Sequence, residues 1–428
     1  MYLPETEIPT TKEKPFEHCK LKRQQHAVNL TNIVKNVNQP FVLVLDAKWG
    51  DGKTTFIKMW QKHLEKEEID TIYFNAWEND FYEDPFMAFL GEISQHFKGK
   101  KIDGLLKTVR TKAVNIVKNI VSDKINDFTG GTIDLQKKID EGFVEQELTR
   151  YENQKTALRE FKTALTTLVQ ENKKKTPLVF FIDELDRCKP TYSIALLERL
   201  KHIFNVEGIF FVLAVDSVQL LKSFKAVYGD IDSQQYFKRF VDITFSFPQA
   251  DLEDFIKDRL ENTVDKFLEN TNNAMEVFAN KKNTINFFSE FISKNYQPTL
   301  RDFEKLFVQV ESVVLINPNM NPFILMVYCF ALFTKLNNRE EYELLKQGKV
   351  EPLFDKLIFD RNSDALDPIV KFIQIPVKFF FSSPPEWDKY RLKMRDEIER
   401  QNIEIRYVTL KHNSKMILDL VESPSHFG

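Results

Sequence analysis

The chain has 428 residues, with 60 Lys and Arg against 63 Asp and Glu, so its formal net charge is −3. Hydrophobic residues make up 43% of it, which excludes a disordered or fibrous chain and allows a buried core in about two to three domains. The near-neutral charge excludes a globally basic nucleic-acid binder, although it leaves a local basic patch open. Three cysteines far apart in the sequence argue against a disulfide scaffold and for a reducing compartment.

Neither the N-terminal segment nor the longest apolar stretch predicts a membrane protein. Residues 1–18 lack the apolar stretch of a signal peptide. The longest apolar stretch, residues 322–336, is shorter than the roughly 18–20 residues that a bilayer span needs, and we interpret it as a buried core helix. We therefore expect a cytoplasmic protein, either free or peripheral to the inner membrane.

Five short apolar runs predict strands that are buried in a sheet. They are Phe41–Leu45, Thr71–Asn75, Leu178–Ile182, Ile209–Val215 and Ile243–Phe247. Most are continuously apolar, which is typical of strands covered on both faces. Helical patterns follow the first run, at residues 56–64, and the third, at residues 194–204. Strands that alternate with helices predict an α/β fold, a parallel sheet with helices on both faces.

A glycine-rich loop follows the first predicted strand. Its candidate nucleotide-binding residues are Trp49, Gly50, Asp51, Gly52, Lys53, Thr54 and Thr55. Residues 52–54 meet the end of the P-loop pattern G-x-x-x-x-G-K-[ST], while Ala47 occupies its first glycine position. The glycines let backbone N–H groups turn toward phosphate oxygens, Lys53 would reach the β and γ phosphates, and Thr54 would hold Mg²⁺. The alternative is a simple glycine turn, but a strand before the loop and a helix after it favour phosphate binding.

Two acidic residues, Asp183 and Glu184, end the third predicted strand. This is the Walker B pattern, and ligands of such sheets bind at the carboxyl ends of the strands. Asp183 would hold Mg²⁺ through water, and Glu184 would orient or deprotonate the attacking water. The alternative is an acidic turn in which Asp186 caps the next helix.

Several spaced motifs together resemble the KAP family of P-loop NTPases. They are Lys48–Thr54, Tyr73–Trp77, Asp183–Cys188, Phe211–Asp216 and Tyr236–Phe240 with Phe247-Pro248. The resemblance covers about residues 15–310. The family usually has Asp at the second acidic position, and Glu184 at that position favours a competent general base.

The resemblance implies an additional-strand core, similar to those of AAA and STAND ATPases, with sheet order 5-1-4-3-2. It also implies a helical lid and ATP as the nucleotide. Family members are associated with membrane-tethered signalling assemblies and, in bacteria and plasmids, with phage exclusion. Many carry transmembrane helices between the second and third strands, where this chain has a long insertion, at about residues 78–176, without a span.

The resemblance also suggests roles for three residues outside the two motifs. Asp216 would sense the γ-phosphate, although it could equally cap the helix that follows. Arg239 (or Lys238) would act as a finger toward a neighbour's nucleotide, with a surface charge as the alternative. Arg301 would be a lid arginine that contacts phosphate, with a simple ion pair as the alternative. The side chains of Trp49 and Trp77 are interpreted as packing residues rather than as chemistry.

We predict three regions: the core at 1–250, a helical lid at 251–345, and a mixed C-terminal region at 346–428 with a helix near 386–400 and a strand near 403–410. Within the insertion, residues 98–124 carry eight Lys or Arg against two Asp, a local charge of +6, beside an apolar helical face. Such a helix could lie on an anionic membrane or contact nucleic acid. The alternative is a helix that packs on the core with its lysines in solvent.

The function predicted from these observations is Mg²⁺-dependent ATP hydrolysis that couples nucleotide state to assembly or effector control in bacterial anti-phage defence. A homo-oligomer or a separate effector protein is the expected partner. Two other functions stay open: a nucleotide-gated scaffold or membrane-associated signalling module with little turnover, and an ATPase stimulated by nucleic acid.

Overall fold

The computed structural model describes residues 9–37, 39–81, 84–99, 102, 104–114, 116, 141–171, 177–247, 254–261, 289, 292, 299–316 and 322–349, with isolated positions beyond them. The chain divides into two compact units, Met1–Pro248 and Gln249–Gly428. The predicted helix at 386–400 and strand at 403–410 lie outside the described residues, so the division at residue 345 stays a prediction.

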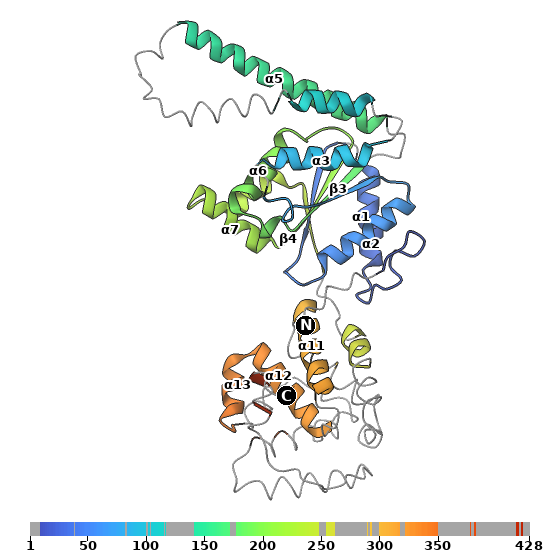
Figure 1. The fold of residues 1–428 in the computed structure, drawn as a ribbon, viewed down its shortest axis with the longest axis vertical. Helices are drawn as coiled ribbons and strands as arrows, with labels where there is room; N and C mark the ends of the chain where they lie inside the picture. Colours follow the sequence, from blue (N-terminus) through green and yellow to red (C-terminus); the bar gives the residue numbers. More distant parts are fainter. Residues whose placement is uncertain are drawn as a thin grey trace, which may run out of the picture. The chain divides into compact units, whose positions relative to one another are not determined.

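The first unit is built on one parallel sheet with helices on both faces (Figure 1). Its strands are β1 (Phe41–Asp46), β2 (Thr71–Asn75), β3 (Leu178–Asp183), β4 (Ile209–Val215) and β5 (Ile243–Ser246). The order β2-β3-β4-β1-β5 is the predicted 5-1-4-3-2 order seen from the other edge, so both the fold class and the topology are confirmed.

Seven helices and two 3₁₀ helices of the first unit are described with their bounds. They are α1 (Gln24–Asn36), α2 (Lys53–Lys66), α3 (Pro85–Phe97), α5 (Glu141–Gln170), η2 (Leu185–Arg187), α6 (Pro190–His202), α7 (Ser217–Tyr228), α8 (Ser233–Phe237) and η3 (Lys238–Phe240). The predicted helices after β1 and β3 are confirmed as α2 and α6. The sequence analysis did not predict α1.

Successive residues of each strand enter two different cores, as the two-residue period of a strand requires. On one face, Phe181 of β3 packs with Trp60 of α2 and with α1. On the other face, Phe180 stacks on Phe89 of α3, with ring centres 4.5 Å apart, in a cluster that includes α6 and α7. Helices on both faces explain why β3 and β4 are apolar throughout and buried at every position.

The edge strand β5 differs from the expectation of a buried strand. It pairs with β1 and is largely exposed, with Ile243 at 40% exposure. The run also ends at Ser246 rather than at Phe247. An edge strand has a neighbour on one side and fewer helices above it, so its apolar residues are not all buried.

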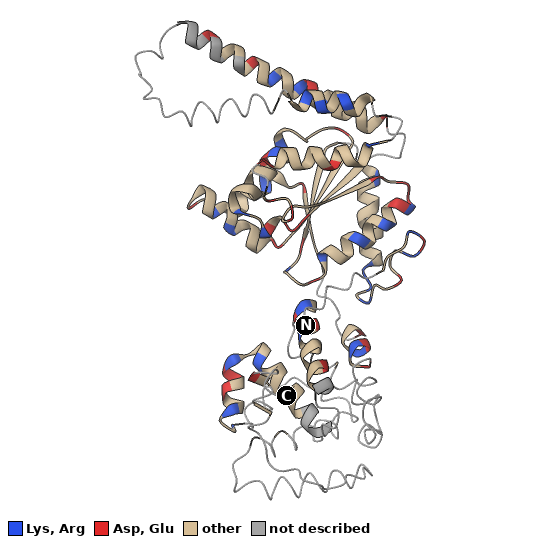
Figure 2. Ribbon diagram, viewed as in Figure 1, with Lys and Arg blue, Asp and Glu red and all other residues tan. Residues whose placement is uncertain are grey.

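The basic segment of the insertion packs onto the core through its apolar face. Residues 104–114 are helical, and their buried side chains, such as Leu106 and Val109, join the cluster of Phe89 together with Phe161 of α5. Lys112 forms an ion pair with Glu160 of α5 at 3.0 Å. Lys and Arg recur along its outer side (Figure 2). Packing thus accounts for the apolar pattern, while the membrane or nucleic-acid partner stays a prediction.

The second unit is helical where it is described. Its helices with described bounds are α11 (Leu300–Ile316), α12 (Pro322–Asn337) and α13 (Arg339–Lys346). The expected core helix at 322–336 is confirmed as α12, in which Tyr328 is fully buried. Thr299 and Asp302 begin α11 with a side-chain hydrogen bond of 2.7 Å, and Asn338 caps α13. No helix among the described residues is long and apolar enough to span a membrane.

Candidate nucleotide site

The predicted site residues of the first unit gather where parallel strands end. In the register of the sheet, Asn75 of β2 is opposite Asp183 of β3, and Asp46 of β1 is opposite Val215 of β4. The glycine-rich loop and the acidic end of β3 therefore leave the same edge of the sheet, with β4 between their strands. This shared edge is where parallel α/β sheets bind their ligands.

The glycine-rich loop has the backbone that phosphate binding needs. Gly50 and Gly52 have φ of 91° and 78°, a region that L side chains rarely adopt. Gly52 is the N-cap residue of α2, and no side chain caps this helix or places a negative charge in its first turn. Thr54 and Thr55 lie in that first turn, so the positive end of the helix faces the loop.

Lys53 lies inside the loop. Its side chain is buried, and its Nζ donates to the carbonyl oxygens of Ala47 at 2.6 Å and Lys48 at 3.2 Å. Burial raises the pKa of Asp183 and of Glu184, and the Lys53 ammonium acts against that rise at both carboxyls, so the cation lies close enough to act on both. The sequence analysis required this proximity.

Arg23 supports the loop from the side of α1, and sequence analysis missed it. Its guanidinium donates to the carbonyl oxygen of Asp51 at 2.7 Å and to that of Gly52 at 3.5 Å, and lies 3.9 Å from the centre of the Phe247 ring. The side chain is 5% exposed, and burial lowers its pKa to about 10, so it stays charged at neutral pH. No local pattern marks this residue, because its partners lie 28 and 29 positions away.

Asp183 is the buried acid at the end of β3, with 1% exposure. It accepts hydrogen bonds from the Thr54 side chain, the Tyr73 hydroxyl at 3.1 Å and the backbone N–H of Glu184 at 2.9 Å. Burial nevertheless raises its pKa. The contact between Thr54 and Asp183 joins the two predicted Mg²⁺ ligands directly. Sequence analysis assigned no role to Tyr73, although it lies in one of the motifs.

These residues fit a magnesium ion that is bound mainly by phosphate and water. Among the residues that the structure describes, no group of three or more His, Cys, Asp or Glu forms a protein-only metal cage. Mg²⁺ prefers this arrangement, with one or two protein oxygens and the rest of its octahedron from substrate and water. Thr54 and Asp183 supply the protein oxygens.

Glu184 follows with an unusual backbone. Its φ of 62° is one of three positive values among the described non-glycine residues. Its side chain forms an ion pair with Arg187, three residues later. Burial raises its pKa to about 7, an effect that Arg187 partly opposes. A carboxyl group with a pKa near neutrality suits a general base.

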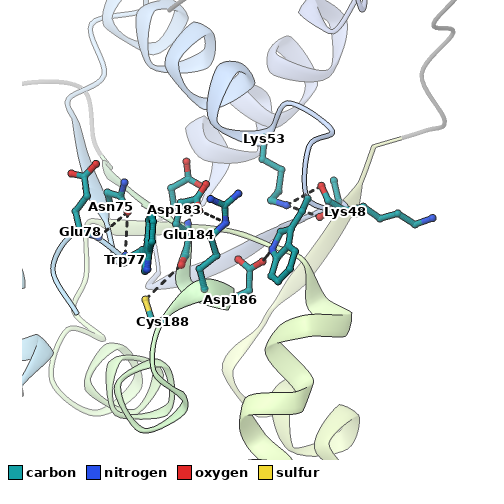
Figure 3. A network of polar contacts seen from close by, with 12 residues as sticks. Lys48, Lys53, Asn75, Trp77, Glu78, Asp183, Glu184, Asp186 and Cys188 are labelled. Atoms are coloured by element: carbon teal, nitrogen blue, oxygen red, sulfur yellow. Dashed lines mark hydrogen bonds and ion pairs between the residues drawn. The ribbon is translucent and has the colours of Figure 1, made fainter. Parts of the chain in front are cut away.

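Two tryptophans, Trp49 and Trp77, lie near the Glu184 carboxyl group. Figure 3 shows Trp77 and the hydrogen-bond network around Asp186. The indole N–H of Trp49 donates to the Asp186 carboxylate. Trp49 and Trp77 are 42% and 53% exposed, so their packing is at the surface of the unit, and the interpretation of both as packing residues rather than as chemistry stays a prediction. Both rings lie at the polar edge of the sheet, where the helices that cover the strands begin or end. Arg187 lies within 6.0 Å of each ring centre.

Asp216 caps α7. Its carboxylate accepts from the backbone N–H of Gln219 at 3.2 Å, and Asp46 supports the same helix by accepting from the N–H of Ser217 at 2.9 Å. Burial raises the pKa of the Asp186 carboxyl, and hydrogen bonds from the Trp49 indole and from the backbone N–H of Asp216 act against that rise. The capping alternative therefore describes its contacts, and the sensor role stays a prediction.

The two predicted arginines belong to elements other than the loop and the end of β3. Arg239 is exposed in η3, 5.4 Å from the centre of the Tyr236 ring, and lines a surface cavity of about 310 Å³ with Tyr228 and Asp232. Its backbone oxygen accepts from Lys201. Arg301 lies on α11 in the second unit. Their roles as finger and lid residues stay predictions.

The sequence was also compared with models of known protein families. The family described as "KAP family P-loop domain" matches residues 23–316, which is more than half of the chain. The chain belongs to this family. The match begins at Arg23 and includes the loop, the acidic end of β3 and α11, so the KAP resemblance drawn from the motifs is confirmed.

Comparison with curated proteins gives no match. Two solved structures of the Aeropyrum pernix ORC2 protein are similar over most of their length. The ADPNP–ADP complex has 12% identity and a TM-score of 0.35, covering 94% of this KAP chain and 98% of that chain. The ADP form has 10% identity and a TM-score of 0.34, covering 98% and 97%.

Proposed function

We propose that this KAP-family protein hydrolyses ATP with Mg²⁺ at the carboxyl edge of its sheet. The observation that carries the proposal is the phosphate loop with Lys53 held against its carbonyl oxygens at 2.6 and 3.2 Å, at the same edge of the sheet as the buried Asp183, whose carboxyl the Thr54 side chain contacts. Phosphoryl transfer needs positioning and charge neutralisation more than covalent chemistry. This cluster supplies both.

Each residue has a physical task in this proposal. The backbone from Gly50 to Gly52 and the start of α2 bind the phosphates. Lys53 exchanges its loop carbonyls for phosphate oxygens and neutralises their charge. Thr54 and Asp183 hold the magnesium ion, which supplies charge neutralisation at the phosphates when it is bound. Glu184 accepts the proton of the attacking water.

The test is phosphate release by three proteins: the wild type, Lys53→Ala and Glu184→Gln. We expect Lys53→Ala to lose nucleotide binding and turnover, and Glu184→Gln to bind ATP while its turnover falls about 100-fold or more. Thr163→Ala, an exposed helical position on α5, is the matched control and should leave turnover unchanged. Turnover that is equal in all four proteins would contradict the proposal.

The scaffold alternative has a specific observation in its favour. Glu184 forms an ion pair with Arg187, and turnover would stay low if ATP binding did not bring the paired carboxylate to the attacking water. Slow wild-type turnover with tight ATP retention, together with a partner that binds in the ATP state alone, would favour this alternative. Turnover that rises when DNA or RNA is added would favour the nucleic-acid-stimulated ATPase.

We further propose that the nucleotide state controls an assembly or an effector in anti-phage defence, in the cytoplasm or at the inner membrane surface. The association of the family with phage exclusion supports this role, and it is an argument by analogy. Phage plating on a bacterial host that carries the wild type or Lys53→Ala tests it. Equal plating efficiency on both would contradict it.

A further inference from the structure

Arg187 joins three segments that sequence order keeps far apart. It forms an ion pair with Glu184. Its guanidinium carbon lies 5.9 Å from the ring centre of Trp49 in the phosphate loop and 6.0 Å from that of Trp77 after β2. Both distances are within the range of a cation–π contact. The arginine is thus the one described cation that contacts both indole rings and the candidate base.

A polar contact holds the indole of Trp49, and another holds the backbone of Trp77 at the end of β2. Trp49 donates its indole N–H to Asp186, while the backbone N–H of Trp77 donates to the Asn75 side chain at 3.1 Å. About half of each indole is exposed, so neither ring belongs to the two cores of the sheet. Both rings are available at this edge of the sheet to contact the guanidinium.

Backbone contacts fix the positions from which the Arg187 and Glu184 side chains extend. The N–H of Arg187 donates to the carbonyl oxygen of Glu184 at 3.1 Å, and the Sγ of Cys188 contacts the same oxygen at 3.5 Å. Glu184 adopts the left-handed conformation that a side chain disfavours, which directs its carboxyl group. With the backbone fixed, only rotation about side-chain bonds can reorient Arg187 and Glu184. The ion pair between them restrains that rotation in both.

We propose that Arg187 is a positioning residue that holds the Glu184 carboxylate in its working orientation, and that Trp49 and Trp77 set the place of the guanidinium. This inference rests on the proposed ATPase function. The inference also connects nucleotide binding to the base. Because Trp49 belongs to the phosphate loop, a movement of the loop on nucleotide binding would move Arg187 and thereby the Glu184 carboxylate.

A merely structural role for Arg187 predicts different behaviour. Its side chain is 24% exposed and packs against exposed rings, whereas the two cores of the sheet are made of other residues. Removing it should therefore change the orientation of Glu184 more than the stability of the fold. A planar guanidinium is needed to lie against indole rings, so Lys should be a poor substitute.

The first experiment compares the wild type with Arg187→Gln, Arg187→Lys and the control Arg199→Gln. Arg199, on α6, also pairs with a carboxylate, that of Asp84 at 3.4 Å, but Asp84 is the N-cap residue of α3 rather than a residue of the site. We expect Arg187→Gln to lower kcat at least about tenfold with the KM for ATP changed less than about twofold, and Arg187→Lys to restore little of the loss. Unchanged kcat, a higher kcat, or a loss confined to KM would each overturn the inference.

The second experiment tests the indole contact in two ways, and its fluorescence measurement does not depend on turnover. Trp77→Phe and Arg187→Gln should be non-additive in kcat, because both act through one guanidinium. In nucleotide-free protein, Glu184→Gln should shift the tryptophan emission, and the shift should shrink in a Trp77→Phe background. If Arg187→Gln does not fold, Trp77→Phe and Glu184→Gln still decide. Additive kcat effects, or an emission that Glu184→Gln leaves unchanged, would overturn it.

The two proposals fail in different ways. A wild type without ATP turnover defeats the proposed function, and the emission measurement still tells whether Arg187 connects Glu184 to the indoles. A wild type with turnover that Arg187→Gln leaves intact defeats this inference alone.

Discussion

The middle of the sheet and its carboxyl edge use the same strands in opposite ways. In β3, Phe180 stacks on Phe89 and has no polar group to satisfy, while Asp183, three residues later, is equally buried but surrounded by donors. The middle gains free energy from apolar burial. At the edge, burial raises the pKa of Asp183 and Glu184, so their charged forms cost free energy.

This difference indicates which region maintains the fold and which is available for chemistry. Removing a side chain from the middle should unfold the protein without altering the mechanism. Changing a side chain at the edge should alter nucleotide chemistry with little loss of stability, and in one case with a gain. The predictions below test this separation, from the largest expected effect to the smallest.

The largest effect is expected in the middle, for Phe89→Ala. The ring is fully buried against Phe74, Phe180 and Phe204, with centre distances of 4.7, 4.5 and 5.1 Å. The cavity should lower the free energy of unfolding by about 3–5 kcal/mol, as measured by urea titration. The kcat of the folded protein should change less than about twofold. Phe81→Ala, at a ring that is 71% exposed, is the matched control, and an equal loss there would argue against the separation.

Thr54→Ala should have the largest effect on chemistry. The change removes a hydrogen bond to Asp183 and an oxygen ligand for Mg²⁺. We expect kcat/KM for Mg·ATP to fall about 100-fold, which is about 2.7 kcal/mol, while the melting temperature changes little. A steady-state titration of Mg²⁺ measures it, with Thr163→Ala as the control. Thr54→Ser keeps the hydroxyl group and should retain most of the activity; failure of that rescue would contradict the assigned role.

Arg23→Met should affect both stability and nucleotide binding, because Arg23 is buried and also contacts the phosphate loop. The guanidinium is buried and donates to loop carbonyls, so its loss should lower the free energy of unfolding by about 2 kcal/mol and weaken nucleotide affinity. Thermal unfolding and nucleotide titration measure both effects. Arg23→Lys keeps the charge but loses the second donor direction. Its free energy of unfolding and its nucleotide affinity should lie between those of Arg23→Met and the wild type. A stability loss with unchanged affinity would show that Arg23 supports the fold but not the loop.

The smallest effect concerns the pH dependence of Glu184→Gln. Burial raises the pKa of Glu184 from 4.5 to about 7, so the folded protein binds this proton more readily than the unfolded chain does. This carboxyl group therefore lowers stability as the pH rises from about 5 to 8, whereas Gln does not titrate. The melting temperature of the variant minus that of the wild type should increase over this interval in the absence of nucleotide. A difference that is constant or falls with pH would contradict the burial argument.

Much of the fold was predictable because its signals are local. Apolar runs bounded by turns located all five strands to within one residue at their ends, and the order of the sheet followed from the resemblance. The loop at Gly50 and Gly52 was predictable because few residues other than glycine adopt its backbone conformation. The helix of residues 322–336 was predictable from its length and hydropathy.

What the sequence missed depends on distance through space. Trp49 and Trp77 were interpreted as packing residues, and their exposure, which no local pattern showed, follows from their place at the edge of the sheet. Ile243 was expected to be buried, but an edge strand has one neighbour. Arg23 carried no local signal at all, because its partners belong to another loop.

The sequence alone determined the chemical groups and the strands that carry them, because a glycine loop and an apolar run that ends in carboxyls are written in consecutive residues. The tertiary structure alone decided which groups share an electrostatic field: the contact of Thr54 with Asp183, and of Arg187 with two distant indoles. The physical reason is that parallel pairing brings the ends of strands together that lie more than 100 residues apart, and hydrogen bonds and charges act across that short distance.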